Sequence, residues 1–406
     1  MTHIVIVGGG LAAGTAAATL RKEGFDGDVT VITDEPHTPY QRPPLSKGYL
    51  QGKEGTDAVL LHPSEWWDEK RIEVRTSTSV TTLDPAEHRV GLADGASLAY
   101  DAVLLATGAS PRRLPIEGAD LPGVHMLRRL DDSDTLRDAL KDGGRRLVLI
   151  GSGWIGMEVA ASARTLGNEV TVLERDAVPL ALAVGEQMGG VFRRLHEDHG
   201  VDLRTSVNVE RIVGSDRAEG VVVDGETVPA DLVLIGVGAV PNTQLAESAG
   251  IEVNNGILTD PALRTSAPDV YAAGDVANAY HPVIQRHLRS EHWENARKAG
   301  PVAAKSMLGI AAAHDSIPYF YTDQFDLGME LSGYPPLMAS ADLVIRGDLD
   351  KREFIAFWVD YGRVVGGMNV NVWEVNKAVQ KLIRSGERVD LGALADPDTP
   401  LESLIP

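Results

Sequence analysis

The sequence contains no cysteine among its 406 residues. Without thiols the protein cannot pass electrons through a redox-active disulfide, which excludes the chemistry of glutathione reductase, thioredoxin reductase and lipoamide dehydrogenase. It also cannot ligate an iron–sulfur cluster of its own through thiolates. Metal-ligand spacing is missing as well, and we expect no metal site at the histidines considered, namely His125, His281, His287, His292 and His314.

Basic charge and long apolar runs are scarce too. Lys and Arg total 38 against 58 Asp and Glu, a net charge of −20 that argues against nucleic acid as a partner. No apolar run is long enough to cross a bilayer. Residues 1–7 already have the pattern of a strand, so we expect no cleaved leader and a cytoplasmic location. A hydrophobic content of 43% is that of a globular protein with room for two or three cores.

Two glycine-rich turns are the most informative feature that is present. Each follows an apolar run typical of a buried parallel strand, residues 4–7 and 147–150, and precedes an alanine-rich helical stretch. Such a turn brings backbone N–H groups and a helix N-terminus onto a pyrophosphate. One match is weak evidence, but two predict two dinucleotides in one protein. The turns contain Gly8, Gly10, Leu11 and Ala12 in the first, and Gly151, Gly153, Ile155 and Gly156 in the second.

An acid at the end of the second strand is expected in each unit, where it binds ribose hydroxyls. The first unit has Asp34 followed by Glu35, and the second has Glu174. A strand-terminal acid is also compatible with a solvated surface charge, although its occurrence in both units favours cofactor binding. Glu174 would repel a 2′-phosphate and so favour NADH over NADPH, an effect that Arg175 could partly offset.

A flavin is the second dinucleotide that best accompanies a nicotinamide, because it accepts and holds a hydride. Residues 104–108 and 270–275 are apolar strands that end in small-residue turns, and residues 235–239 close the second unit in the same way. Asp275 could bind the polyol of a flavin dinucleotide. These turns contain Ala106, Thr107, Gly108, Val237, Gly238, Gly274 and Asp275.

From about residue 8 to 331 the order of motifs resembles the FAD-dependent, NADH-dependent ferredoxin reductases of bacterial oxygenase systems, which are related to putidaredoxin reductase, rubredoxin reductase and apoptosis-inducing factor. The most specific match is the segment 39–47, and segments 154–158, 272–275 and 292–296 continue it. The resemblance implies an α/β fold with two Rossmann-like dinucleotide-binding domains of glutathione-reductase type, plus a C-terminal α+β domain.

We expect three domains, the first of them discontinuous. Residues 1–113 and 243–317 would bind FAD, residues 114–242 would bind NAD, and residues 318–406 would form the C-terminal domain. Within the last, residues 353–370 indicate an antiparallel hairpin and residues 373–384 an amphipathic helix. The acidic, proline-containing tail from Asp390 is expected to be only partly ordered.

Lys47 and Glu158 are the candidate catalytic residues. Lys47 alone would be taken for a solvated loop charge, and Glu158 for a glutamate that favours a helix N-terminus. The resemblance places Lys47 beside flavin N5 and Glu158 near the nicotinamide, so we expect an inter-domain ion pair between them that aligns the two rings and balances charge as the flavin becomes anionic. The resemblance also implies FAD contacts from four residues: Arg42, Arg128, Val80 and Trp293. For the two arginines the alternative is a surface charge, and for Val80 and Trp293 it is simple packing. Tyr321 is expected beside the flavin, with core packing as the alternative.

The function implied is a transfer of hydride from NADH to FAD, followed by single electrons to a [2Fe–2S] ferredoxin that supplies a cytochrome P450 or a ring-hydroxylating oxygenase. An NADH redox sensor like apoptosis-inducing factor and a rubredoxin reductase are the alternatives. A basic segment just after Asp275 is the candidate landing place for the carrier, with a structural helix face as the other interpretation. It contains Arg286, His287, Arg289, His292, Arg297 and Lys298, interrupted by Glu291 and Glu294.

Overall fold

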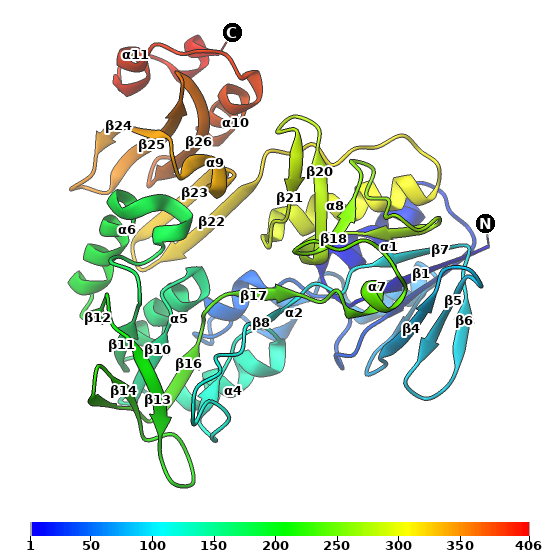
Figure 1. Ribbon diagram of the computed structural model, residues 1–406, viewed down its shortest axis with the longest axis horizontal. Helices are drawn as coiled ribbons and strands as arrows, with labels where there is room; N and C mark the ends of the chain where they lie inside the picture. Colours follow the sequence, from blue (N-terminus) through cyan, green and yellow to red (C-terminus); the bar gives the residue numbers. More distant parts are fainter. Residues whose placement is uncertain (1, 406) are drawn as a thin grey trace. The chain divides into compact units, whose positions relative to one another are not determined.

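The computed structural model describes residues 2–405 of the chain, which fold into two compact units (Figure 1). Unit 1 comprises the residues up to Arg42, Gly55–Ser110 and Ala239–Ser316. Unit 2 comprises Pro43–Glu54, Pro111–Gly238 and the chain from Ile317 onward. The segments expected as the NAD-binding and C-terminal domains both fall largely in unit 2, and the expected domain boundaries remain a prediction.

Unit 1 is built on a five-stranded parallel sheet with the order β19-β7-β1-β2-β3. Its strands are short apolar runs, and all four residues of β7 are buried, as expected of a sheet covered on both faces. Helices α1 (Leu11–Lys22) and α8 (Trp293–Met307) pack closely (Figure 1). A Cβ on Gly300 of α8 would lie 2.4 Å from Ala12 O, so the two helices could not approach this closely with a larger residue there. The strands are β1 (His3–Val7), β2 (Asp28–Ile32), β3 (Ile72–Arg75), β7 (Ala102–Leu105) and β19 (Val270–Ala272).

Smaller elements complete unit 1. An antiparallel meander consists of β4 (Val80–Asp84), β5 (Arg89–Leu92) and β6 (Ser97–Ala99). A three-stranded sheet consists of β18 (Ile257–Thr259), β20 (Ala277–His281) and β21 (Arg286–Leu288). The short elements are α2 (Thr56–Val59), α3 (Ser64–Glu69), β17 (Ala239–Pro241), α7 (Gln244–Ser248) and the 3₁₀ turn η2 (Gly274–Val276). The strand β8 (Ala109–Pro111) begins in the last two residues of the Gly55–Ser110 segment.

Unit 2 repeats the same plan. Its parallel sheet has the order β12-β11-β10-β16-β9, and a meander of β13, β14 and β15 follows. The strands are β9 (Val124–His125), β10 (Arg146–Ile150), β11 (Glu169–Leu173), β12 (Asp202–Arg204), β13 (Val209–Val213), β14 (Gly220–Val223), β15 (Glu226–Pro229) and β16 (Leu232–Ile235). The helices are the 3₁₀ turn η1 (Pro43–Ser46), α4 (Leu130–Leu140), α5 (Trp154–Thr165) and α6 (Ala181–Asp198). The duplicated α/β architecture expected from the two glycine turns is confirmed.

An antiparallel sheet with the order β22-β23-β26-β25-β24 forms the C-terminal part of unit 2. Its strands are β22 (Tyr319–Gln324), β23 (Leu327–Gly333), β24 (Asp342–Asp348), β25 (Glu353–Asp360) and β26 (Arg363–Val370). The expected hairpin over residues 353–370 is therefore present, as β25 and β26. The short helix α9 (Pro335–Met338) precedes β24, and the helix expected over residues 373–384 begins later, as α10 (Asn376–Ser385).

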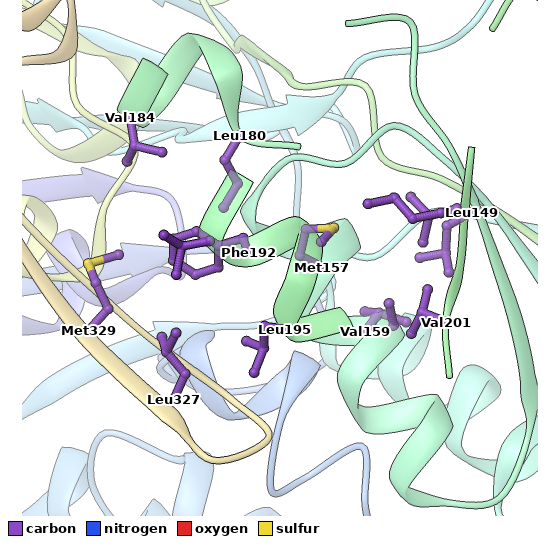
Figure 2. Packing of buried hydrophobic residues seen from close by; sticks show 14 of the residues in the cluster. Leu149, Met157, Val159, Leu180, Val184, Phe192, Leu195, Val201, Leu327 and Met329 are labelled. Atoms are coloured by element: carbon purple, nitrogen blue, oxygen red, sulfur yellow. The ribbon is translucent and has the colours of Figure 1, made fainter. Parts of the chain in front are cut away.

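The C-terminal sheet shares a hydrophobic core with α5 and α6. Figure 2 shows Phe192 and Leu195 of α6 between Met157 on one side and Leu327 and Met329 on the other. The side chain of Phe192 is fully buried. This packing places β22 in contact with α5, the helix that contains Glu158.

The expectation of a partly ordered tail is wrong. Residues 391–395 form α11 (Leu391–Ala395), and η3 (Leu401–Leu404) follows. Leu394 is 0% and Leu401 5% exposed, and both belong to a core cluster with Phe357 and Val379. Spaced apolar residues anchor this segment despite its acids and prolines. No helix within residues 2–405 is long and apolar enough to span a membrane.

Candidate functional site

The first glycine turn joins β1 to α1 in unit 1. Gly8 N donates to Ile32 O at 2.8 Å, and Gly8 has a φ of 126°, a conformation that favours glycine. A Cβ there would lie 2.1 Å from Ala106 O, so the chain runs too close for any side chain. Gly10 caps α1 without a side chain, which leaves the N-terminal N–H groups of the helix to a ligand. Leu11 and Ala12 are buried in its first turn.

Arg42 is held beside this turn by a buried acid that the sequence analysis did not single out for this role. Arg42 Nη2 lies 2.8 Å from Oε1 of Glu35, and the Tyr40 hydroxyl donates to Oε2 of the same carboxylate. A Cβ on Gly10 would meet Arg42 Nη1 at 3.2 Å. Glu35 is only 6% exposed, and its carboxylate holds the Arg42 guanidinium beside the N-terminus of α1. A positive charge at this place suits a phosphate group.

The acids at the ends of the two second strands are not equivalent. In unit 2 the residue directly after β11 is Glu174, whose N donates to Arg204 O. In unit 1 the residue in that place is Thr33, whose N donates to Arg75 O, and Asp34 comes one position later. Asp34 is exposed at the strand end. Asp34 is therefore one position further from its strand than Glu174 is. The ribose contact expected of Asp34 remains a prediction.

The remaining turns of unit 1 lie against the first one. Gly274 has a φ of 80°, and a Cβ there would lie 3.0 Å from the Cβ of Ala12. The turn of Ala106, Thr107 and Gly108 is fixed by Asn242, a residue that the sequence analysis missed. Thr107 Oγ1 donates to Asn242 O and Asn242 Nδ2 donates to Thr107 O, both at 2.8 Å. A sequence pattern gives no signal for Asn242, since it acts across 135 residues.

Other expected FAD contacts are placed as follows. Val80 is half-buried at the start of β4. Trp293 begins α8, and its Nε1 donates to Gln41 Oε1 at 3.1 Å within unit 1. Asp275 follows Gly274 in η2. Arg128 belongs to unit 2, where its N donates to Asp132 Oδ2 at 2.9 Å just before α4.

The second glycine turn joins β10 to α5 in unit 2, and each of its three glycines meets a different structural requirement. Gly151 has a φ of 98°, and a Cβ there would lie 2.5 Å from Gly236 O. A Cβ on Gly156 would lie 2.6 Å from Gly151 O, so it allows close packing of helix and strand. Among the residues described, Gly236 O at 4.0 Å would be the nearest neighbour of a Cβ on Gly153. That open position lets a pyrophosphate approach the backbone.

Glu174 is fixed at this turn. Its Oε2 accepts from Ser152 N at 2.8 Å and from Ser152 Oγ at 2.5 Å, and its Oε1 accepts from Asp176 N at 2.8 Å. The Arg175 side chain is 83% exposed and lies 3.7 Å from Asp176 Oδ1. Ile155 is 45% exposed in the first turn of α5, while Val237 is half-buried and Gly238 has a φ of 101° after β16.

The expected ion pair between Lys47 and Glu158 is present, but it does not join the two compact units, because both residues lie in unit 2. Lys47 Nζ is 2.7 Å from Glu158 Oε2, and the Glu158 side chain is only 3% exposed. Ser46 Oγ donates to the same oxygen at 2.5 Å, and Thr322 Oγ1 donates to Oε1 at 2.7 Å. A buried carboxylate requires this full set of partners. The Tyr321 ring lies 5.9 Å from Lys47 Nζ, and burial raises the pKa of Tyr321 to about 12.

The basic segment of unit 1 is partly neutralised by its own acids. Arg297 Nε lies 2.5 Å from Glu294 Oε2, and Lys298 Nζ lies 3.1 Å from Glu294 Oε1. Arg289 is paired with Glu291, and its side chain is only 13% exposed. Arg286 and His287 are exposed on β21, while the His292 ring accepts from Glu294 N as the cap of α8. Arg286 is thus the most accessible of the arginines in the hairpin.

The two turns fit two dinucleotides. Each has a helix N-terminus without a side-chain cap and a central glycine, Gly10 or Gly153, that leaves room for phosphate. In the part of the chain that the structure describes, no group of three or more His, Asp or Glu side chains is arranged to hold a metal ion. Two turns of this kind are compatible with redox transfer between two bound dinucleotides.

Comparisons with known proteins agree with this arrangement. Residues 2–300 match the pyridine nucleotide-disulphide oxidoreductase family, and residues 319–405 match the reductase C-terminal family. Rhodocoxin reductase of Rhodococcus erythropolis is 38% identical over 405 residues, which cover 99% of this chain and 94% of that protein. The ferredoxin–NAD(+) reductase component of the anthranilate 1,2-dioxygenase system of Burkholderia cepacia is 35% identical over 406 residues, 99% of this chain and 98% of that protein.

A solved structure is similar over the whole chain. The covalent complex of putidaredoxin reductase with putidaredoxin contains a chain that matches with a TM-score of 0.95 and 32% identity, covering 100% of this chain and 98% of that one. The similarity therefore includes both glycine turns and the C-terminal sheet.

Proposed function

The chain belongs to the pyridine nucleotide-disulphide oxidoreductase family, with the C-terminal domain of the ferredoxin reductases of oxygenase systems, and we propose that it is an NADH-dependent ferredoxin reductase. The observation that carries the proposal is the pair of glycine turns in a chain without cysteine. Two dinucleotides imply hydride exchange, and without a dithiol the electrons leave for a carrier outside the chain.

The first turn is proposed to bind FAD and the second NADH. Gly8, Gly10 and the N-terminus of α1 would hold the FAD pyrophosphate, and Arg42, fixed by Glu35, would add a positive charge there. Glu174 supports NADH over NADPH, because its carboxylate is held at the glycine turn while Arg175 extends into solvent. When bound, FAD accepts two electrons from NADH and releases them singly.

Lys47 and Glu158 are proposed as the residues that balance charge at this step. Lys47 supplies a positive charge that stabilises negative charge as it develops, and Glu158 fixes the direction of the lysine side chain. The chain itself contributes mainly orientation, so no general acid or base is required.

The acceptor is proposed to be a [2Fe–2S] ferredoxin that supplies a cytochrome P450 or a ring-hydroxylating oxygenase. A relative named for a dioxygenase system and the complex of putidaredoxin reductase with putidaredoxin support this class of partner. Docking is proposed near Arg286, Arg289, Arg297 and Lys298, and the exposure of Arg286 supports it most, since the other three have acidic partners. A cytoplasmic location remains a prediction.

A panel of carriers tests the proposal. Purified protein with FAD and NADH should reduce cytochrome c only when a carrier is added, and [2Fe–2S] ferredoxins should give higher kcat/KM than rubredoxin. A rate with rubredoxin that equals or exceeds that with every ferredoxin would identify a rubredoxin reductase instead. Slow NADH oxidation with every carrier, together with a long-lived reduced state, would favour the redox-sensor alternative.

A further inference from the structure

Strand β22 brings two buried polar side chains to the same face, toward α5 and α6. Thr322 is 0% and Gln324 1% exposed, and residues two apart on a strand share a face. Thr322 Oγ1 lies 2.7 Å from Glu158 Oε1, and Gln324 Nε2 lies 3.2 Å from Thr322 Oγ1. Gln324 Oε1 in turn lies 2.8 Å from Nε2 of His196 on α6. A continuous hydrogen-bond chain thus leads from His196 to Glu158.

The charge of Glu158 sets the direction of this chain. A carboxylate only accepts hydrogen bonds, and a threonine hydroxyl has a single proton, so the Thr322 proton points to Glu158. Thr322 Oγ1 must then accept from the Gln324 amide N–H₂. The Gln324 oxygen therefore faces His196 Nε2, which has to carry the proton.

His196 can fill this role because it is fully buried, and burial lowers its pKa to about 4. A neutral imidazole has one N–H, and the chain requires it on Nε2. Within residues 2–405 His196 Nδ1 has no hydrogen-bond partner, which agrees with a bare nitrogen on that side.

The opposite direction brings two lone pairs together. With the proton on His196 Nδ1, Gln324 would turn its amide N–H₂ to Nε2 and its oxygen to Thr322. The Thr322 proton would then go to Gln324, and Thr322 Oγ1 would face the Glu158 carboxylate at 2.7 Å without a proton between them. In a buried setting that contact is repulsive.

We propose that Thr322, Gln324 and His196 are positioning residues, which hold Glu158 and through it Lys47 in place for the hydride transfer proposed above. Glu158 has two donors on Oε2, Ser46 and Lys47, and Thr322 on Oε1. Loss of the Thr322 hydroxyl removes the donor on Oε1 and lets the carboxylate rotate, so that Lys47 loses its fixed direction. The C-terminal sheet would therefore contribute to hydride transfer from NADH bound at the second glycine turn. This inference rests on the proposed function.

The first test compares two substitutions of one residue. Thr322→Val keeps the shape and removes the hydroxyl, and we expect flavin reduction by NADH in a single turnover to slow about tenfold or more. The NADH dissociation constant should change by less than about threefold, because the loss is in orientation rather than binding. Thr322→Ser keeps the hydroxyl and should recover most of the rate.

Ser332→Ala is the matched control. Ser332 is a fully buried hydroxyl in the same sheet, bonded to Asn376 Oδ1 at 2.6 Å, so its loss should lower thermal stability and leave the rate unchanged. Equal rates in the valine and serine variants, a loss that serine fails to restore, or an effect confined to NADH binding would overturn the proposal. If Thr322→Val does not fold, Gln324→Met decides, with an expected loss of about threefold; no loss there counts against it.

A second test is independent of activity. In ¹⁵N NMR of histidine-labelled holoprotein, the signal that disappears in His196→Phe should have the pattern of the Nε2–H tautomer. An Nδ1–H tautomer would reverse the chain and overturn the proposal. Because this measurement needs no turnover, it also separates the two hypotheses: failure of NADH to reduce the unaltered protein would contradict the proposed function, whereas the tautomer still decides the network.

Discussion

Lys47 and Glu158 form an ion pair of 2.7 Å in which the carboxylate is almost completely buried. The two residues are 111 positions apart, yet η1 and α5 bring them together with Ser46 as a further donor to the same oxygen. A buried charge pair is weak evidence for stability, because desolvation offsets most of its attraction. Its place at the start of α5 agrees with the proposed role of Lys47 as a fixed positive charge.

Lys47→Ala should therefore slow flavin reduction by NADH more than it weakens NADH binding. We expect a rate loss of about tenfold or more in single-turnover stopped flow, because an interaction that strengthens as charge develops acts on the transition state. Lys53→Ala, which removes an exposed lysine from the same segment, is the control and should leave the rate unchanged. An unchanged rate of flavin reduction in the Lys47 variant would show that this lysine is a loop charge without a role in the reaction.

Glu174 should decide the choice of nucleotide. The native protein should favour NADH over NADPH in kcat/KM by at least about tenfold, on the order of 1.4 kcal/mol. Glu174→Ala should narrow that difference, chiefly by weakening NADH binding. Arg175→Ala is the matched control, since its side chain is 83% exposed and should contribute little. Equal use of both nucleotides by the native protein would show that Arg175 offsets Glu174.

Arg286 should matter for the carrier and not for NADH. Arg286→Glu should raise the KM for ferredoxin and flatten its salt dependence, because reversal of an exposed charge acts on association. Reduction of ferricyanide should stay the same. Arg89→Glu, at an exposed position on β5, is the control for net charge. If both activities fall in the Arg286 variant, the segment is structural; if neither changes, ferredoxin docks elsewhere.

The tail offers a test of stability with two leucines three residues apart. Leu394 is fully buried, and Leu394→Ala should cost about 2–5 kcal/mol of unfolding free energy. Leu391 is 44% exposed, and Leu391→Ala should change it by less than about 0.5 kcal/mol. Equal effects in denaturant titrations would mean that the tail is not anchored through Leu394.

Local sequence predicted the parts of the site that depend on local geometry. The glycine turns were evident because positive φ and close approach leave few alternatives at Gly8 and Gly151. Asn242 and Thr322 were missed, and Glu35 was named only as a strand-end acid and not as the partner of Arg42. Each acts on a residue that the fold brings near, and no local pattern marks that contact.

The tail was predicted wrongly for a related reason. Its acids and prolines indicate weak order, but burial of Leu394 and Leu401 against the C-terminal sheet outweighs them. Tertiary packing of a few apolar residues is not visible in the composition of a short segment.

The central claim, that the protein carries FAD and reduces it with NADH, is tested most directly by anaerobic titration of the purified protein. Denaturation should release FAD, and about one equivalent of NADH per flavin should bleach the visible flavin absorbance, because both transfer two electrons. Subsequent addition of about two equivalents of oxidised [2Fe–2S] ferredoxin per flavin, each accepting one electron, should restore the flavin absorbance. A protein that neither contains nor takes up flavin, or a flavin that NADH leaves oxidised, would contradict the account.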